Sequence, residues 1–175
     1  FRSGLDELHN VDAVNAVNND IITYDATNEK WVNTATPTLD KISLTPDENV
    51  AHSEGSMYYN DEYKALTVFS DISDVSLQVG LEDWIRVYNN TGSVITNGTP
   101  VYSLGALGEA LSVAPANASS AAESQVMGIA THDIAVDGYG FITERGLISG
   151  IDTSTLTAGE RVHLSPTGGM QSAAP

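Results

Sequence analysis

The alternation of apolar and polar positions predicts two short β-hairpins in the N-terminal part of the chain. In the first, the apolar run Ile21 to Tyr24 precedes the turn residues Ala26 to Glu29, and a second run covers Lys30 to Val32. A similar unit, "SMYYNDEYKALTVF", occupies residues 56–69. In each unit a Tyr-Asp or Tyr-Asn step leads into a polar stretch with a lysine, and apolar residues then resume. A hairpin of this size buries too little surface to fold alone, so each must pack against something else.

Residues 1–20 place an apolar side chain at every third position: Leu5, Leu8, Val11, Val14 and Val17. Period three fits a short helix or an extended stripe that packs around a three-fold axis. The frequent asparagines disfavour a long helix. Around a three-fold axis the stripe would meet its own copies.

Residues 34–54 are rich in Thr and Pro and read as a linker, because Pro37 and Pro46 block a continuous helix. From residue 81 onward, short apolar runs are separated by Gly, Asn and Asp. The expected strands are 75–79, "WIRVYNN", "TPVYSLG", 111–113, "SQVMGIATHDI", "YGFITERGLISGI" and one within "LTAGERVHLSP". The two long strands "SQVMGIATHDI" and "YGFITERGLISGI" are joined by "AVDGYG", where Asp137-Gly138 is a strong turn signal.

This spacing predicts a small β-barrel or sandwich. The expected fold is therefore mainly β: an extended N-terminal shaft with hairpin units, then the barrel or sandwich module, intertwined as a trimer. The expected segments are 1–54 (hairpin and linker), 55–80 (second hairpin) and 81–175 (β module).

Seven apolar or aromatic side chains are the candidate core or trimer-interface anchors. They are Leu5, Leu8, Val11, Tyr24, Trp31, Tyr59 and Trp84. Burying one aromatic ring contributes about 2–3 kcal/mol. Six aromatic residues could alternatively stack on sugars: Trp31, Trp84, Tyr58, Tyr59, Tyr88 and Tyr102.

Net charge excludes several classes of partner. The chain carries 23 acidic and 7 basic residues, a formal charge of −16. Such a polyanion repels phosphate backbones and anionic membrane surfaces, so binding to nucleic acid or to such surfaces is not expected. No stretch is long and apolar enough to span a membrane, so membrane insertion is not expected either. A solvated acidic surface is the simplest interpretation. Divalent-cation binding is the alternative, although no EF-hand-type loop is present.

Candidate chemistry is sparse, and we expect neither catalysis nor a bound cofactor or metal. Cysteine is absent, which excludes disulfides and thiolate sites. The sequence has no Gly-x-Ser-x-Gly elbow, no phosphate-binding loop and no His-Glu-x-x-His motif. His132 and Asp133 fall in the strand expected over "IATHDI", where we expect a hydrogen-bonded structural pair. His132 and His163 could also converge in space.

About half of the chain resembles a module of tailed-bacteriophage virion proteins described as tail fibre, head fibre or structural protein. The motifs that carry the resemblance are "NNTG", "ITNGTPVY", "GIATHDI", "YGFITERGLI" and "TAGERVHLSP". "LDELHNV" and "IITYDATNEKWVN" resemble the shaft segments that join such modules. Related modules end before a "LDELHNV"-like run and continue beyond a "GGMQSAAP"-like one. The resemblance therefore implies that this chain begins at the end of one module and is truncated within the next.

The resemblance implies a homotrimeric fibre segment on the tail, neck or head of a virion, in contact with other virion proteins and aiding host attachment. The first alternative is a capsid decoration protein that stabilises the phage head. A weaker alternative is a carbohydrate-binding receptor module that takes a host cell-surface glycan.

Overall fold

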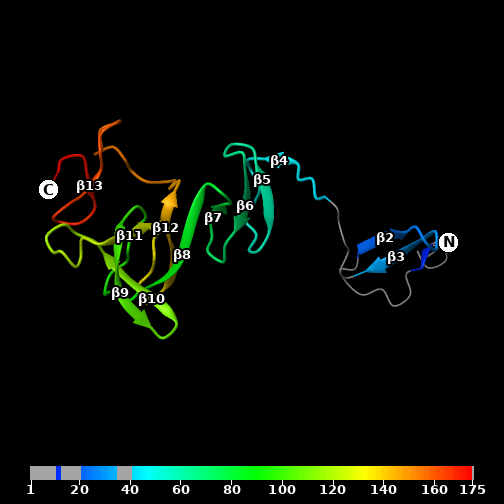
Figure 1. Ribbon diagram of the computed structural model, residues 1–175, viewed down its shortest axis with the longest axis horizontal. Coiled ribbons are helices and arrows are strands. Elements are labelled where there is room, and N and C mark those ends of the chain that lie inside the picture. The colour runs from blue at the N-terminus through cyan, green and yellow to red at the C-terminus, as the bar shows by residue number, and fades with distance from the viewer. Residues whose placement is uncertain (1–10, 13–20, 35–40, 175) are drawn as a thin grey trace. The chain divides into compact units, whose positions relative to one another are not determined.

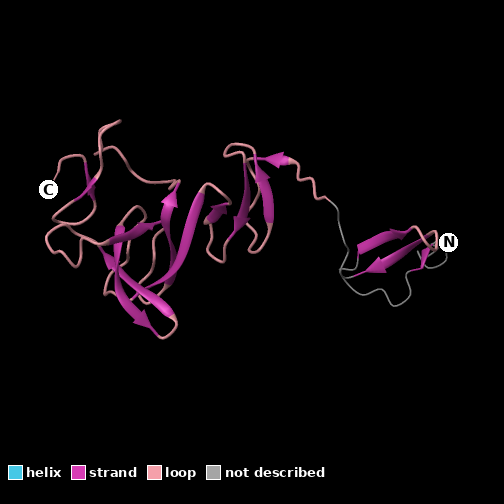
Figure 2. Ribbon diagram, in the orientation of Figure 1, coloured by secondary structure: helices cyan, strands magenta, loops and turns pink. Residues whose placement is uncertain are grey.

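The computed structural model describes residues 11–12, 21–34 and 41–174, and it divides the chain into two compact units, 1–43 and 44–175 (Figure 1). Every regular element among the described residues is a β-strand (Figure 2). No helix in the described part is long and apolar enough to cross a membrane. The expectation of a mainly β fold is confirmed. The strands are β1 (Val11–Asp12), β2 (Ile21–Asp25), β3 (Lys30–Thr34), β4 (Pro46–Asp47), β5 (Met57–Asn60), β6 (Ala65–Phe69), β7 (Ser76–Gln78), β8 (Glu82–Asn89), β9 (Pro100–Leu107), β10 (Ala110–Pro115), β11 (Val126–Ala130), β12 (Tyr139–Gly146), β13 (His163–Leu164) and β14 (Met170–Gln171).

The first unit contains a three-stranded sheet in the order β1-β3-β2. β2 and β3 form the first predicted hairpin, with Tyr24 opposite Trp31 and Asp25 opposite Lys30. β1 adds to the free edge of β3 in parallel, and this places Val11 beside Trp31. Leu5 and Leu8, the other members of the predicted stripe among the anchors, lie outside the described residues.

The second unit begins with a four-stranded sheet in the order β4-β5-β6-β7. The second predicted hairpin is β5 and β6, and β7 pairs antiparallel with β6. Residues 34–54 were expected to form only a linker, but β4 pairs in parallel with β5, which places Pro46 opposite Tyr59. Proline tolerates this position because an edge strand leaves one side of its backbone free of ladder hydrogen bonds.

A closed five-stranded barrel follows in the order β10-β8-β12-β11-β9, so the expectation of a small barrel is confirmed. β10 closes it by lying parallel to β8 on one side and antiparallel to β9 on the other. Seven buried side chains fill the interior: Val87, Ile95, Val101, Val113, Ala130, Ile134 and Ile142. Closure removes free sheet edges from this part of the chain.

The barrel contains an internal pseudo-two-fold repeat centred on Ile95 and Ile134. Each of these residues donates its N–H to the carbonyl oxygen of the other, at 3.0 and 2.7 Å. Both lie in loops that leave one strand, cross the barrel end and enter the next strand, β8 to β9 and β11 to β12. Both side chains are fully buried. The two loops therefore pack on each other as matched halves.

The hydrogen bonds around this centre also occur in pairs. Asn89 N–H donates to the Gly138 carbonyl oxygen at 2.9 Å, and Ala130 N–H donates to the Thr99 carbonyl oxygen at 2.9 Å. Each loop ends in a tight turn with one residue in the left-handed region. This residue is Gly98 in the loop before β9 and Asp137, with a φ of 54°, in the loop before β12. Asp137 is the first residue of the Asp-Gly pair that is a strong turn signal in the sequence.

Two details of the sequence-based prediction are wrong in this region. β11 ends at Ala130, so His132 and Asp133 lie in the loop after the strand and not within it. β11 and β12 do pair antiparallel, but the loop between them covers residues 131–138 and is not a tight hairpin. The cause is the pairing of Ile134 with Ile95, which pulls the segment away from the sheet.

The two compact units differ from the three segments predicted from the sequence, 1–54, 55–80 and 81–175. Residues 44–54 belong with the second hairpin through β4, and the hairpin sheet and the barrel fall in one unit. The sheet of β4 to β7 and the barrel are nevertheless separate sheets. The division into three segments stays a prediction.

Candidate interaction surfaces

The two hairpins have the same turn structure. A side-chain oxygen at the end of the first strand, Asp25 Oδ1 or Asn60 Oδ1, accepts the backbone N–H groups two and three residues later. The distances are 2.9 and 3.2 Å for Asp25 and 2.9 and 3.0 Å for Asn60. Each turn then ends on a residue with a positive φ of 54°, Glu29 or Lys64. The repeat seen in the sequence is therefore a repeat of local geometry.

The first sheet exposes an aromatic face, which we call its tyrosine face: Val11, Ile22, Tyr24, Trp31 and Asn33. These residues share a face because partners across a ladder, and residues two apart along a strand, point the same way. Three of the predicted anchors, Val11, Trp31 and Tyr24, form one row across the three strands. The Tyr24 and Trp31 rings lie 5.3 Å apart, yet their side chains are 52% and 43% exposed.

The second sheet has the corresponding tyrosine face: Pro46, Met57, Tyr59, Leu66, Val68 and Leu77. Aligning Asp25 with Asn60 places Tyr59 where Tyr24 stands and Leu66 where Trp31 stands. Met57 is 56% exposed, and Tyr59 and Leu66 are partly exposed. The predicted anchor Tyr59 thus lies on the same face of its hairpin as Tyr24.

The opposite face of the second sheet is buried within its own unit. Ala65, Thr67 and Phe69 have at most 8% of their surface exposed. The Phe69 ring packs against His52 at 4.8 Å and Tyr58 at 5.3 Å. Among the described residues of this sheet, the tyrosine face is therefore the more exposed of the two faces.

Neither tyrosine face carries a charged residue. All eleven members are apolar, aromatic, proline or asparagine. In a chain with 23 acidic residues this is a local exception, and it removes the charge repulsion that would otherwise oppose contact between copies.

The second hairpin sheet is joined to the barrel through a buried carboxylate. Glu82, at the start of β8, is 8% exposed. It accepts the Gln78 backbone N–H on Oε1 and the Trp84 indole N–H on Oε2, both at 2.8 Å. The Trp84 ring in turn packs at a tilt against Phe141 of β12, with 4.9 Å between the ring centroids. The predicted anchor Trp84 is thus an intramolecular anchor where β7 leads into the barrel.

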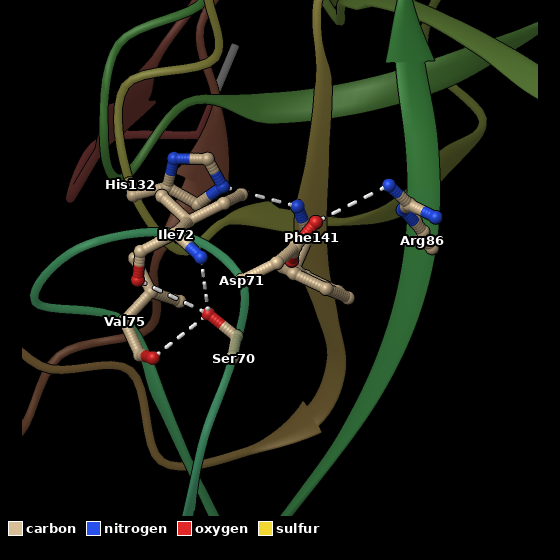
Figure 3. Close-up of polar contacts among 7 residues, drawn as sticks. All are labelled: Ser70, Asp71, Ile72, Val75, Arg86, His132 and Phe141. Carbon is tan, nitrogen blue, oxygen red and sulfur yellow. Dashed lines mark hydrogen bonds and ion pairs between the residues drawn. The ribbon is translucent and has the colours of Figure 1, made fainter. Parts of the chain in front are cut away.

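A turn of the hairpin sheet also reaches the barrel wall (Figure 3). Ser70 Oγ donates to the Val75 carbonyl oxygen at 2.8 Å and accepts the Ile72 N–H at 3.1 Å, which fixes the turn. Asp71 then forms an ion pair with Arg86 of β8, with 3.3 Å between Oδ2 and Nη2. Both side chains are about half exposed, so this pair contributes little stability by itself.

The outward side of β8 and β12 forms an aromatic strip: Trp84, Arg86, Tyr88, Tyr139 and Phe141. Tyr88 pairs with Tyr139 across the ladder, and their rings meet at 5.2 Å. The Arg86 guanidinium lies 4.7 Å from the centroid of the Tyr139 ring, a cation–π contact. Partial burial, together with the nearby Asp137 carboxylate, raises the pKa of the Tyr88 hydroxyl. Tyr139, 52% exposed, is the most open aromatic residue of the strip.

Only part of this strip was found from the sequence. Trp84 and Tyr88 were among the candidate sugar-stacking residues, but Tyr139, Phe141 and Arg86 were not. The signal was the alternation in "WIRVY" and "YGF", where residues two apart share a face. Pairing the two strands needs their register, which the sequence does not give.

Both ring nitrogens of His132 are used for structure. Nδ1 lies 2.9 Å from the Asp133 carbonyl oxygen, and Nε2 accepts the Phe141 backbone N–H at 3.1 Å (Figure 3). These partners fix a neutral tautomer with the proton on Nδ1. Burial lowers the pKa of His132, with the Asp133 carbonyl and carboxylate opposing in part. The expected hydrogen bond between His132 and Asp133 therefore uses the Asp133 carbonyl oxygen, while the Asp133 carboxylate accepts the Asn97 N–H at 2.8 Å.

In the described part of the chain, no group of three or more His, Asp or Glu side chains is placed to hold a metal ion. His163 lies on β13 beside an apolar groove, whereas His132 is held at the loop between β11 and β12. No family model, curated protein or solved structure matches the chain at a significant level.

Proposed function

We propose that this chain is a non-enzymatic structural component of a bacteriophage virion. In this role it is a segment of a homotrimeric fibre that projects from the tail, neck or head and aids attachment to the host. Its partners are its own copies and neighbouring virion proteins.

The observation that supports this proposal is the repeated tyrosine face. Two hairpins with the same turn geometry each have an uncharged face on which large apolar or aromatic side chains are exposed, Tyr24 and Trp31 on the first and Met57 on the second. A repeated unit with one open apolar face is stable when copies of the chain cover that face for each other. Repetition of such a unit lengthens a fibre without requiring a new kind of contact.

The test is the mass of the purified full chain by sedimentation equilibrium. We expect a trimer, and we expect Trp31→Asp to shift the equilibrium towards monomer because it places a charge on the tyrosine face. Val94→Asp is the matched control: Val94 is 50% exposed but lies in a barrel loop, and this variant should keep the trimer. A wild-type chain that remains monomeric at high concentration would refute the fibre proposal.

A second candidate, a capsid decoration protein, is favoured by an apolar groove in the barrel unit. This groove has a volume of about 380 Å³, and Pro100, Val126, Ile129, Leu164 and Met170 are among its lining residues. A shell protein could insert an apolar segment there while the acidic surface faces solvent. Binding of the chain to emptied phage heads, lost in Val126→Asp and retained in Trp31→Asp, would favour this role over the fibre.

A further inference from the structure

We infer that the hollow beside Tyr139 on the barrel wall is a binding site for one neutral hexopyranose unit. The hollow lies on the outward side of β8 and β12, where the turn between β9 and β10 approaches them. Arg86, Glu109, Ala110 and Tyr139 line a concavity of about 260 Å³. This site is independent of the proposed fibre role, because none of these residues belongs to either tyrosine face.

The open ring of Tyr139 supplies the apolar part of the site. The Tyr88 ring contacts this ring and the Arg86 guanidinium lies over it, so its orientation is held by two neighbours on β8. Even so, 52% of the Tyr139 side chain remains exposed. A fixed, exposed aromatic ring can stack on the C–H face of a pyranose, since that face is apolar while the ring edge carries hydroxyls.

Two polar groups supply the complementary hydrogen bonds. Arg86 uses Nη2 for its ion pair with Asp71, and the guanidinium has further N–H donors. Glu109 lines the same hollow and forms no ion pair in the described part of the chain. One group is therefore a donor and the other an acceptor, and a sugar hydroxyl can accept from the first and donate to the second.

The local charge selects a neutral sugar over an acidic one. Around the hollow the carboxylates of Asp71 and Glu109 outnumber the single guanidinium of Arg86. The chain as a whole carries −16, which repels an anionic ligand. The volume accommodates one ring and little more, and a site this open and small binds in the millimolar range.

The experiment titrates the full-length chain with methyl glycosides of glucose, galactose and mannose while NMR follows the Tyr139 and Ala110 signals. We expect saturable shifts with at least one sugar. Tyr139→Ala should weaken this binding about tenfold or more, and Tyr139→Phe should retain it because the stacking surface is kept. Glu109→Gln should weaken it several-fold through loss of the carboxylate acceptor.

Tyr63→Ala is the matched control, since Tyr63 lies in the turn of the second hairpin and should leave sugar binding unchanged. The absence of a saturable shift with every sugar, or undiminished binding by Tyr139→Ala, would overturn the inference. Shifts caused by methylguanidinium but by none of the sugars would also overturn it and identify a cation site instead. Because sedimentation of the same sample reports the oligomer, failure of sugar binding and failure of the fibre proposal are distinguishable.

Discussion

At the scale of single residues, Glu82 is the group on which the join between the hairpin sheet and the barrel depends most. Its two carboxylate oxygens accept two separate donors, the Gln78 backbone N–H and the Trp84 indole N–H. Glu82→Gln keeps the shape but replaces one acceptor oxygen with an NH₂ group that faces a donor. We expect a loss of about 1–3 kcal/mol in the free energy of unfolding, measured by urea denaturation.

The neighbouring variant Asp83→Asn is the control for this prediction. Asp83 accepts two hydrogen bonds from Arg145, but both side chains are mostly exposed. The control should therefore change stability by less than about 0.5 kcal/mol. Equal losses in the two variants would show that the buried carboxylate has no special role at the join.

Gly146, the last residue of β12, is required by both space and backbone conformation. A Cβ atom there would lie 2.1 Å from the Leu81 carbonyl oxygen, and the φ of 116° is unfavourable for any other residue. Gly146→Ala should cost more than about 2 kcal/mol, measured as a fall in the thermal unfolding midpoint. Gly92→Ala, in an open loop with no atom within 4 Å of the added Cβ, should be close to neutral.

His132 gives the stability a pH dependence of known sign. Burial lowers its pKa below the ordinary value of 6.5, so between the two values the unfolded chain binds the proton and the folded chain does not. Stability therefore falls as pH drops below 6.5 and stops falling, for this group, below the lowered pKa.

The measurement for His132 is the free energy of unfolding at about pH 8 and about pH 5 in wild type and His132→Gln. The wild type should lose more stability on acidification than the variant, whose side chain does not titrate. An equal loss in both proteins would show that other groups account for the acid sensitivity.

At the scale of elements, the hairpin turns depend on one side-chain oxygen each. Asn60→Ala removes the acceptor for two backbone N–H groups of the turn and should cost about 1 kcal/mol. Asn60→Asp should keep the two turn hydrogen bonds, because aspartate accepts the same pair in the first hairpin, although it loses the amide donor to the Tyr58 hydroxyl oxygen. Hydrogen exchange of the Glu62 and Tyr63 amides would report the effect locally, and unchanged protection in Asn60→Ala would contradict the prediction.

Both hairpins could be predicted from the sequence because their signals are local. Alternation, turn residues and strand length are all readable within about fifteen residues, and the predicted turn at 26–29 has the predicted place in the structure. The same holds for the strands around Trp84 and Tyr139. Side-chain pairs such as Tyr24 and Trp31 follow once a short turn sets the register.

Features of the fold that depend on pairing between segments far apart in the sequence could not be predicted. The matched loops around Ile95 and Ile134 share almost no residues, and their similarity lies in backbone hydrogen bonds. The insertion of β10 between β8 and β9 and the parallel addition of β4 to β5 are equally invisible in local patterns. For the same reason, the hollow beside Tyr139 could not be predicted, since its lining comes from β8, the turn between β9 and β10, the start of β10, and β12.

At the scale of the whole molecule, the net charge opposes self-association, whereas the uncharged tyrosine faces favour it. Each chain carries 23 acidic and only 7 basic residues, so copies that approach one another repel over long range. In the proposed trimer the tyrosine faces supply apolar burial at contact, which salt does not weaken. With so few cations per chain, ion pairs between copies cannot offset the repulsion.

This opposition predicts that salt strengthens self-association. Raising ionic strength from about 0.01 M to about 1 M shortens the screening length from about 30 Å to about 3 Å, which removes most of the repulsion while the apolar contact remains. Sedimentation equilibrium of the full chain should therefore show a higher trimer fraction at high salt, with Trp31→Asp monomeric under both conditions. A trimer that dissociates as salt rises would mean that charge pairs hold the copies together, and the tyrosine faces would then lose their assigned role.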